Sequence, residues 1–179
     1  LRLWYIGVNT TRGPLKDVRV RRAIAMALDV PTLLSQLLAN RGRVAAGVIP
    51  PSLEGADTTR RALPYDSAGA RALLAQAGFA NGIDLELWCS QTAPFPRLAQ
   101  SLQAYLAAAG IRIKIVQRDA GAMRDAARAG QTDLVVKDWY ADYPDAENFL
   151  FPLLHTANRG AGGNVSFFSN PAFDKLVDD

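Results

Sequence analysis

Apolar segments of strand length alternate with segments of helical periodicity in the second half of the chain, and this alternation restricts the possible folds most strongly. The expected strands and helices, in chain order, are residues 83–88, 95–109, 111–116, 120–128 and 132–139. Strands that alternate with helices usually pair in parallel through right-handed crossovers, and the helices cover the faces of the sheet. The sequence therefore predicts an α/β fold with a mainly parallel, mixed sheet flanked by helices.

The first half of the chain predicts one more strand and three short helices. Residues 1–9 have the bulk and β-branching of a buried strand. Asp17 and Asp66 are suitable N-caps for the first and third helices, and Pro31 suits the first turn of the second. Residues 41–65 are rich in glycine and proline, and we expect a long surface loop there.

Composition and charge exclude several classes of protein. With 179 residues and 49% hydrophobic content, the chain can bury a full core. No apolar run approaches the roughly 20 residues that cross a bilayer. The arginines are scattered and the net charge is only +3, so we expect no nucleic-acid partner. Cys89 is the only cysteine and lies in an apolar run, which predicts a buried thiol without a disulfide.

The sequence offers no arrangement of residues that would serve an enzyme. Its single histidine, His155, follows an apolar run and is expected in a loop or at a helix end, without a catalytic role. There is no nucleophile elbow, no Walker-type loop and no zinc-protease motif. We therefore expect no enzymatic activity and no cofactor.

An acidic and aromatic segment follows the last expected strand of the alternation. Within eight positions it contains Asp138, Trp139, Tyr140, Asp142, Tyr143 and Asp145, and Glu147 follows closely. Ligands of open α/β sheets bind beyond the carboxyl ends of the strands, which is where this segment lies. Because the chain as a whole is basic, this local negative charge indicates a cationic or ammonium-bearing partner.

Asp142 is the first candidate for contact with an ammonium group, since a carboxylate beside an aromatic wall can form a charge-assisted hydrogen bond. Trp139 and Tyr140 are candidates for the apolar and stacking surface of such a site. In the alternative interpretation, the aromatic rings fill the core at a strand end and the acids cap a helix at residues 145–154. Capping is the favoured role for Asp145.

Two further interpretations of the acidic segment stay open. Asp138, Asp142 and Asp145 could in principle hold a hard cation, but their spacing matches no established cation-binding loop, and we expect no metal site. The same segment could instead form a protein-interaction surface without small-ligand transport.

Six stretches in order, covering nearly the whole chain, resemble the second large lobe of the extracellular solute-binding proteins of family 5, the peptide/nickel class. The stretches are NTTRGPLKDVRVRRAIAMALD, GRVAAGVIPP, LPYDSAGARALLAQAGFANGIDLEL, LAAAGIRIKI, DWYADYPDAENFL and GGNVSFFSNPAFDKLVDD.

The resemblance implies that residues 1–179 form one α/β lobe of a two-lobed periplasmic binding protein, type II and cluster C like. The first, N-terminal lobe and the signal peptide would lie outside this sequence. The implied function is the substrate-binding component of a bacterial ABC importer, periplasmic or extracellular and either lipid-anchored or soluble. It would capture a peptide or a similar ammonium-bearing solute and deliver it to the permease subunits in the membrane.

The resemblance also implies roles for individual residues. Asp142 matches the aspartate that pairs with the α-ammonium of the ligand in oligopeptide-binding members. The backbone at residues 138–140 would pair with an extended peptide, and Trp139 would line a side-chain pocket. Asp138 departs from the family pattern, which has a small residue there, and a second carboxylate would favour a more cationic ligand.

Overall fold

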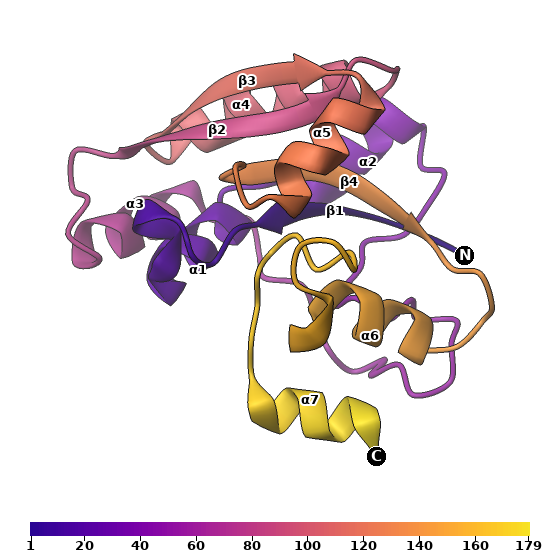
Figure 1. Cartoon of the computed structure of the whole chain (residues 1–179). Helices are drawn as coiled ribbons and strands as arrows, with labels where there is room; N and C mark the ends of the chain where they lie inside the picture. The colour runs from indigo at the N-terminus through magenta and orange to yellow at the C-terminus, as the bar shows by residue number, and fades with distance from the viewer.

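A four-stranded mixed sheet forms the centre of the computed structural model, which describes all residues 1–179 (Figure 1). The strands are β1 (Arg2–Val8), β2 (Ile83–Ser90), β3 (Ile111–Arg118) and β4 (Leu134–Tyr140), in the spatial order β1-β4-β2-β3. β2 pairs in parallel with both β3 and β4, whereas β1 pairs antiparallel with β4. The predicted α/β class and mainly parallel, mixed sheet are confirmed.

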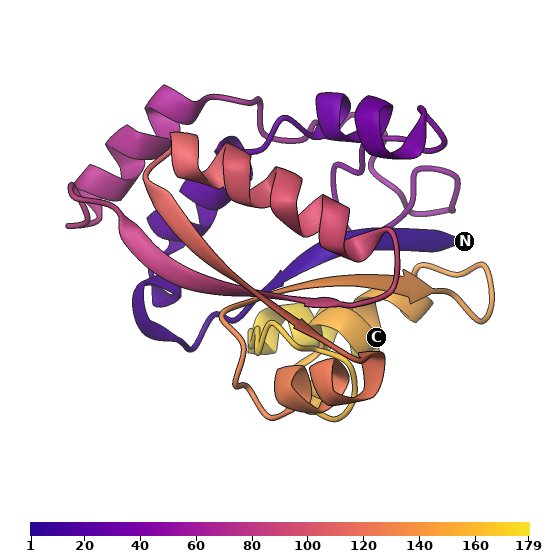
Figure 2. The same ribbon diagram turned by 90° about the horizontal axis from the view of Figure 1, so that it is seen from above.

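Two helices connect the parallel strands and cover opposite faces of the sheet (Figure 2). α4 (Phe95–Ala108) joins β2 to its neighbour β3, and α5 (Ala120–Arg128) leads from β3 back past β2 to β4. These two steps cross the sheet in opposite directions. Crossovers of the same hand therefore place the two helices on opposite faces.

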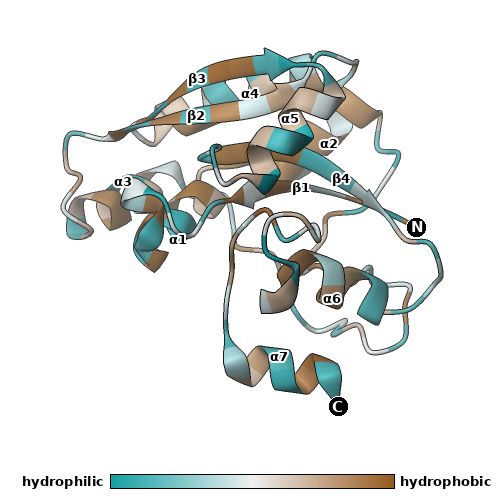
Figure 3. Ribbon diagram, viewed as in Figure 1, coloured by the Kyte–Doolittle hydropathy of each residue, from teal (hydrophilic) through white to brown (hydrophobic).

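The main hydrophobic core lies between the sheet and the helices on the α4 face. Leu87, Leu106 and Leu134 are fully buried there, and so is Cys89, as its apolar surroundings predicted. Burial also raises the pKa of the Cys89 thiol. Figure 3 shows apolar residues along the strands and both apolar and hydrophilic residues on α5, where Arg124, Asp125 and Arg128 are exposed.

The helices of the first half begin where their capping residues predicted. Asp17 accepts a hydrogen bond from the Arg19 amide at the start of α1 (Val18–Met26), and Asp66 accepts one from the Gly69 amide at the start of α3 (Ser67–Gln76). α2 (Val30–Leu38) has Pro31 in its first turn, with Asp29 as its N-cap. No helix or strand forms between α2 and α3. No helix of the structure combines the length and the apolarity that a bilayer crossing requires.

The prediction of a buried strand at the start of the chain is correct for the strand and wrong for its burial. β1 lies at an edge of the sheet, and only Leu3 and Gly7 among its residues are buried. The bulky residues Trp4, Tyr5 and Ile6 are only partly covered. Their composition indicates a strand but does not reveal how many neighbours that strand has.

The face of the sheet opposite α4 also carries the last part of the chain. α6 (Glu147–Leu154) packs below β1 and β4, and α7 (Pro171–Asp178) lies beyond it at the outer end of the molecule (Figure 1). Leu3 of β1 packs with Phe149 and Leu153 of α6 in a small separate core. This packing fixes the segment between β4 and α6, which contains the candidate site.

Candidate ligand-binding site

The carboxyl ends of three parallel strands and the start of β1 lie at the same end of the sheet. We call this end, where β2, β3 and β4 finish, the carboxyl edge. β2, β3 and β4 run in the same direction, and β1 runs against them, so Arg2 lies opposite Tyr140. The pairing continues one step further, because the Ala141 amide donates to the carbonyl oxygen of Leu1 at 3.1 Å. Asp138, Trp139 and Tyr140 are the last three residues of β4, and only the rest of the acidic segment lies beyond the strand as predicted (Figure 1).

Asp142 occupies the bend just after β4. Its side chain is exposed and forms no hydrogen bond or ion pair within the chain. Its backbone amide donates to Oδ1 of Asn148, 3.2 Å away, which ties the bend to the start of α6. The bend is thus anchored through its backbone while the carboxylate stays available to a ligand.

Trp139 points to the α6 side of the sheet and is half-buried. Its indole Nε1 donates to the backbone carbonyl oxygen of Asn148 at 2.8 Å, and its ring packs beside the small core of Leu3, Phe149 and Leu153. These contacts agree with the structural role that was the alternative for the aromatic residues.

Asp138 and Tyr140 point to the opposite side of the sheet, because successive side chains of a strand alternate between its two faces. Asp138 forms an ion pair with Arg2, with Oδ2 at 2.9 Å from Nη2 and 3.0 Å from Nε. Tyr140 is 60% exposed, and its ring lies against the Arg2 guanidinium. The distance from the guanidinium carbon to the centroid of the Tyr140 ring is 4.7 Å. The four predicted site residues thus surround one strand end without forming a single cluster.

The remaining polar residues of the segment are engaged at the start of α6. Asp145 accepts a hydrogen bond from the Glu147 amide at 2.8 Å, so its carboxylate serves the helix start although Ala146 is the N-cap residue. Tyr143 donates its hydroxyl hydrogen to the Glu147 carboxylate, and this bond raises the pKa of Tyr143. Asp142 is therefore the carboxylate of this segment that has no partner.

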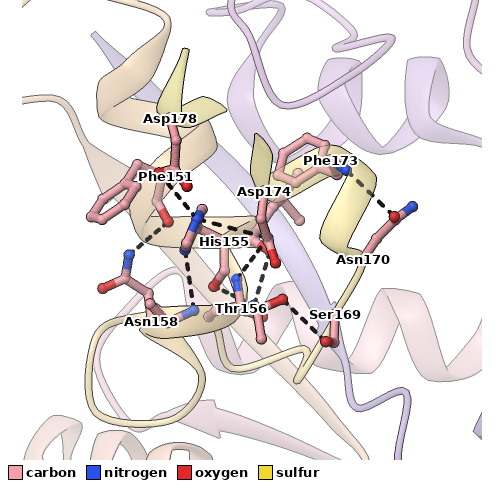
Figure 4. Close-up of polar contacts among 12 residues, drawn as sticks. Phe151, His155, Thr156, Asn158, Ser169, Asn170, Phe173, Asp174 and Asp178 are labelled. Carbon is pink, nitrogen blue, oxygen red and sulfur yellow. Dashed lines mark hydrogen bonds and ion pairs between the residues drawn. The ribbon is translucent and has the colours of Figure 1, made fainter. Parts of the chain in front are cut away.

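His155 is buried at the end of α6, and a helix end was one of the two positions predicted for it (Figure 4). Its Nδ1 accepts a hydrogen bond from the Ala157 amide, and its Nε2 lies 3.4 Å from Asp178 and 3.9 Å from Asp174. The ring also packs on Phe151. These contacts connect α6 to α7. No group of three or more histidine, cysteine, aspartate or glutamate side chains is arranged to hold a metal ion.

Two cavities of the structure lie away from the acidic segment. One, of about 470 Å³, lies between the loop at residues 44–62 and the apolar residues Leu150, Leu154 and Phe173. The other, of about 290 Å³, lies under β1. The Asp57 carboxylate, the only acidic group that lines the first cavity, is already bonded by Thr59 of its own loop, so this cavity offers no free carboxylate to an ammonium group. The carboxyl edge is the better candidate because it has an unpaired charge on a fixed bend.

Two residues of this region were not identified from the sequence. Arg2 approaches Asp138 only because β1 and β4 pair, across 136 positions of the chain. Asn148 is 6% exposed and uses its side-chain oxygen to hold the bend. An asparagine shortly after an acidic segment gives only a weak signal, and Arg2 gives none without the strand order.

Comparisons with known proteins agree on one family. The model of the bacterial extracellular solute-binding proteins, family 5 Middle, matches residues 1–161. Di/tripeptide-binding protein 2 of Pseudomonas aeruginosa (strain UCBPP-PA14) is 37% identical over 97% of the chain and 33% of its own length. Heme-binding protein A of Haemophilus influenzae is 30% identical over the entire chain and 34% of its own length.

A solved structure shows the same fold. The periplasmic binding protein DppA from Helicobacter pylori, in complex with the peptide STSA, superposes with a TM-score of 0.94 at 28% identity, covering 99% of this chain and 35% of that one. The chain thus spans about a third of the length of the relatives that it matches.

Proposed function

Because the chain belongs to the bacterial extracellular solute-binding proteins of family 5, we propose that it supplies one lobe of the substrate-binding component of an ABC importer. The family comprises binding proteins rather than enzymes. The complete protein would act in the periplasm or at the cell exterior, where it closes its two lobes over a solute. It would then deliver that solute to the permease subunits.

The ligand that we propose is a peptide or another small solute with an ammonium group. The free carboxylate of Asp142 carries this proposal, since it is exposed at the carboxyl edge of the sheet on a bend that Asn148 holds in place. A charged hydrogen bond from an ammonium group to such a carboxylate strengthens when a second lobe excludes water. The printed names of the relatives include both di/tripeptide and heme binding, so family membership alone does not select the ligand.

Titration calorimetry of the full-length protein with short peptides tests this function. Asp142→Asn keeps the size of the side chain and removes its charge, so we expect peptide binding to weaken by about 1.5–3 kcal/mol. Asp145→Asn is the matched control, because the Asp145 carboxylate is already bonded to the Glu147 amide, and its affinity should stay close to that of the wild type.

Equal affinities of the wild type and Asp142→Asn would reject the assigned role of Asp142. If the full-length protein gave no heat with any peptide or ammonium-bearing solute, the proposed transport function would fail. Docking of a protein on the acidic segment would then be the remaining interpretation.

A further inference from the structure

Arg2 lies at the centre of a stack of side chains that crosses the carboxyl edge. Its guanidinium carbon is 4.7 Å from the ring centroid of Trp4 and 4.7 Å from that of Tyr140. Trp4 stacks in turn on Phe95, the first residue of α4, with centroids 5.4 Å apart. The stack therefore joins the start of β1, the end of β4 and the start of α4, with the guanidinium between two rings.

The Arg2 guanidinium directs two of its nitrogen atoms at Asp138. Nε donates to Oδ2 of this carboxylate at 3.0 Å, and Nη2 lies 2.9 Å from the same oxygen in the ion pair. Arg2 makes no other ion pair, and the Asp138 carboxylate accepts no other hydrogen bond. One positive and one negative charge thus cancel locally beside the strand end, four residues before Asp142.

We propose that Arg2 is a specificity-determining residue, which neutralises Asp138 so that the site favours ligands with one ammonium group over ligands with two. This inference rests on the proposed function, because it concerns the charge that an incoming solute meets at the same edge. Without Arg2, the edge would present two free carboxylates, Asp138 and Asp142. A second positive group on the ligand would then gain a partner.

The stack also explains why arginine suits this position better than lysine. A planar guanidinium can lie between two rings and donate from one edge at the same time, whereas an ammonium group offers neither property. Arg2→Lys should therefore keep the charge and hold Asp138 less firmly, so its effect on ligand choice should lie between those of the wild type and Arg2→Met.

Calorimetry with two dipeptides on the full-length protein tests the proposal. The probes are Ala-Ala, with one ammonium group, and Lys-Ala, with two, and the readout is the ratio of their dissociation constants. Arg2→Met should lower the dissociation constant of Lys-Ala relative to that of Ala-Ala about tenfold, as expected for one freed carboxylate near the surface. In the double variant with Arg2→Met and Asp138→Asn, the ratio should return to the wild-type value.

Asp138→Asn alone gives an independent prediction that does not depend on removing Arg2. It leaves the Arg2 guanidinium without its partner, so the dissociation constant of Lys-Ala should rise relative to that of Ala-Ala, again by about tenfold. An unchanged ratio in both Arg2→Met and Asp138→Asn, in proteins that unfold cooperatively as the wild type does, would overturn the role of Arg2.

Arg12→Met is the matched control, because Arg12 pairs with Asp133 beside the same two strands at the opposite end of the sheet. It removes one arginine and leaves the Asp133 carboxylate with only its hydrogen bond from the Glu86 amide, far from the carboxyl edge, and the ratio should not change. If the wild type bound neither dipeptide, the proposed function would fail together with this inference. If it bound them and no variant changed the ratio, only the inference about Arg2 would fail.

Discussion

At the scale of single residues, Asn148 anchors the bend that carries Asp142. Its side-chain oxygen accepts the Asp142 amide at 3.2 Å and its backbone oxygen accepts the Trp139 indole at 2.8 Å. One buried residue thus holds both the bend and the last inward-facing side chain of β4. A bend whose backbone is held in position before a ligand arrives favours tighter binding, because less backbone freedom is lost on binding.

Asn148→Ala should therefore reduce both the stability of the protein and its affinity for peptide. It leaves the Asp142 amide without its partner, and we expect a loss of about 1–3 kcal/mol in the free energy of unfolding, measured by urea denaturation. Asn158→Ala is the control, because Asn158 bonds the Phe151 carbonyl oxygen away from the bend and should lower stability alone. Peptide affinity that stays unchanged in folded Asn148→Ala would contradict this role.

At the scale of helices and strands, capping residues and hydrophobic patterns predicted which elements form. The exact ends of the strands and their places in the sheet depend on pairing with other strands, which these local patterns do not contain. Asp17 and Asp66 mark helix starts because a capping bond joins residues only two or three positions apart. The first two strands of the alternation extend two residues beyond the predicted ends, to Ser90 and Arg118, because pairing between β2 and β3 continues through polar residues. The edge position of β1 likewise depends on the whole sheet.

The cap of α1 gives a prediction of pH dependence. Hydrogen bonds from the Arg19 side chain and then from its amide lower the pKa of Asp17 from 3.8 to about 2. Because the folded-state pKa lies below the unfolded one, the Asp17 carboxylate stabilises the fold above about pH 3.8 and loses this effect as the pH falls to about 2.

Asp17→Asn should therefore unfold at a lower temperature than the wild type at neutral pH, and the difference should disappear as the pH approaches 2. Thermal unfolding followed by circular dichroism measures this difference. Glu54→Gln is the control, since Glu54 forms no hydrogen bond or ion pair in the chain. A difference between Asp17→Asn and the wild type that is the same at every pH would contradict the role of the carboxylate charge.

At the scale of the whole molecule, the strand order brings distant segments to one edge. The sequence predicted that the acidic segment would lie beyond a strand end, because that follows from the alternation of strands and helices alone. It did not predict that β1 would run antiparallel beside β4 and bring Arg2 to Asp138. For this reason Asp138 was expected to add a free negative charge, whereas the structure pairs it with an arginine.

The separation of Trp139 from Asp138 and Tyr140 has the same origin. Strand alternation sends Trp139 to α6 and its two neighbours to the face that carries α4. We therefore propose that a ligand at this edge meets Asp142 on the bend and Tyr140 at the strand end, while Trp139 packs on the α6 side of the sheet.

A crystal structure of the full-length protein with the ligand that it binds would test the central claim most directly. We expect the Asp142 carboxylate inside the cleft between the two lobes, with an oxygen about 2.7–2.9 Å from a nitrogen of the ligand's ammonium group. An Asp142 that pointed into solvent outside the cleft, or that paired with an arginine of its own lobe while the ligand bound elsewhere, would contradict it.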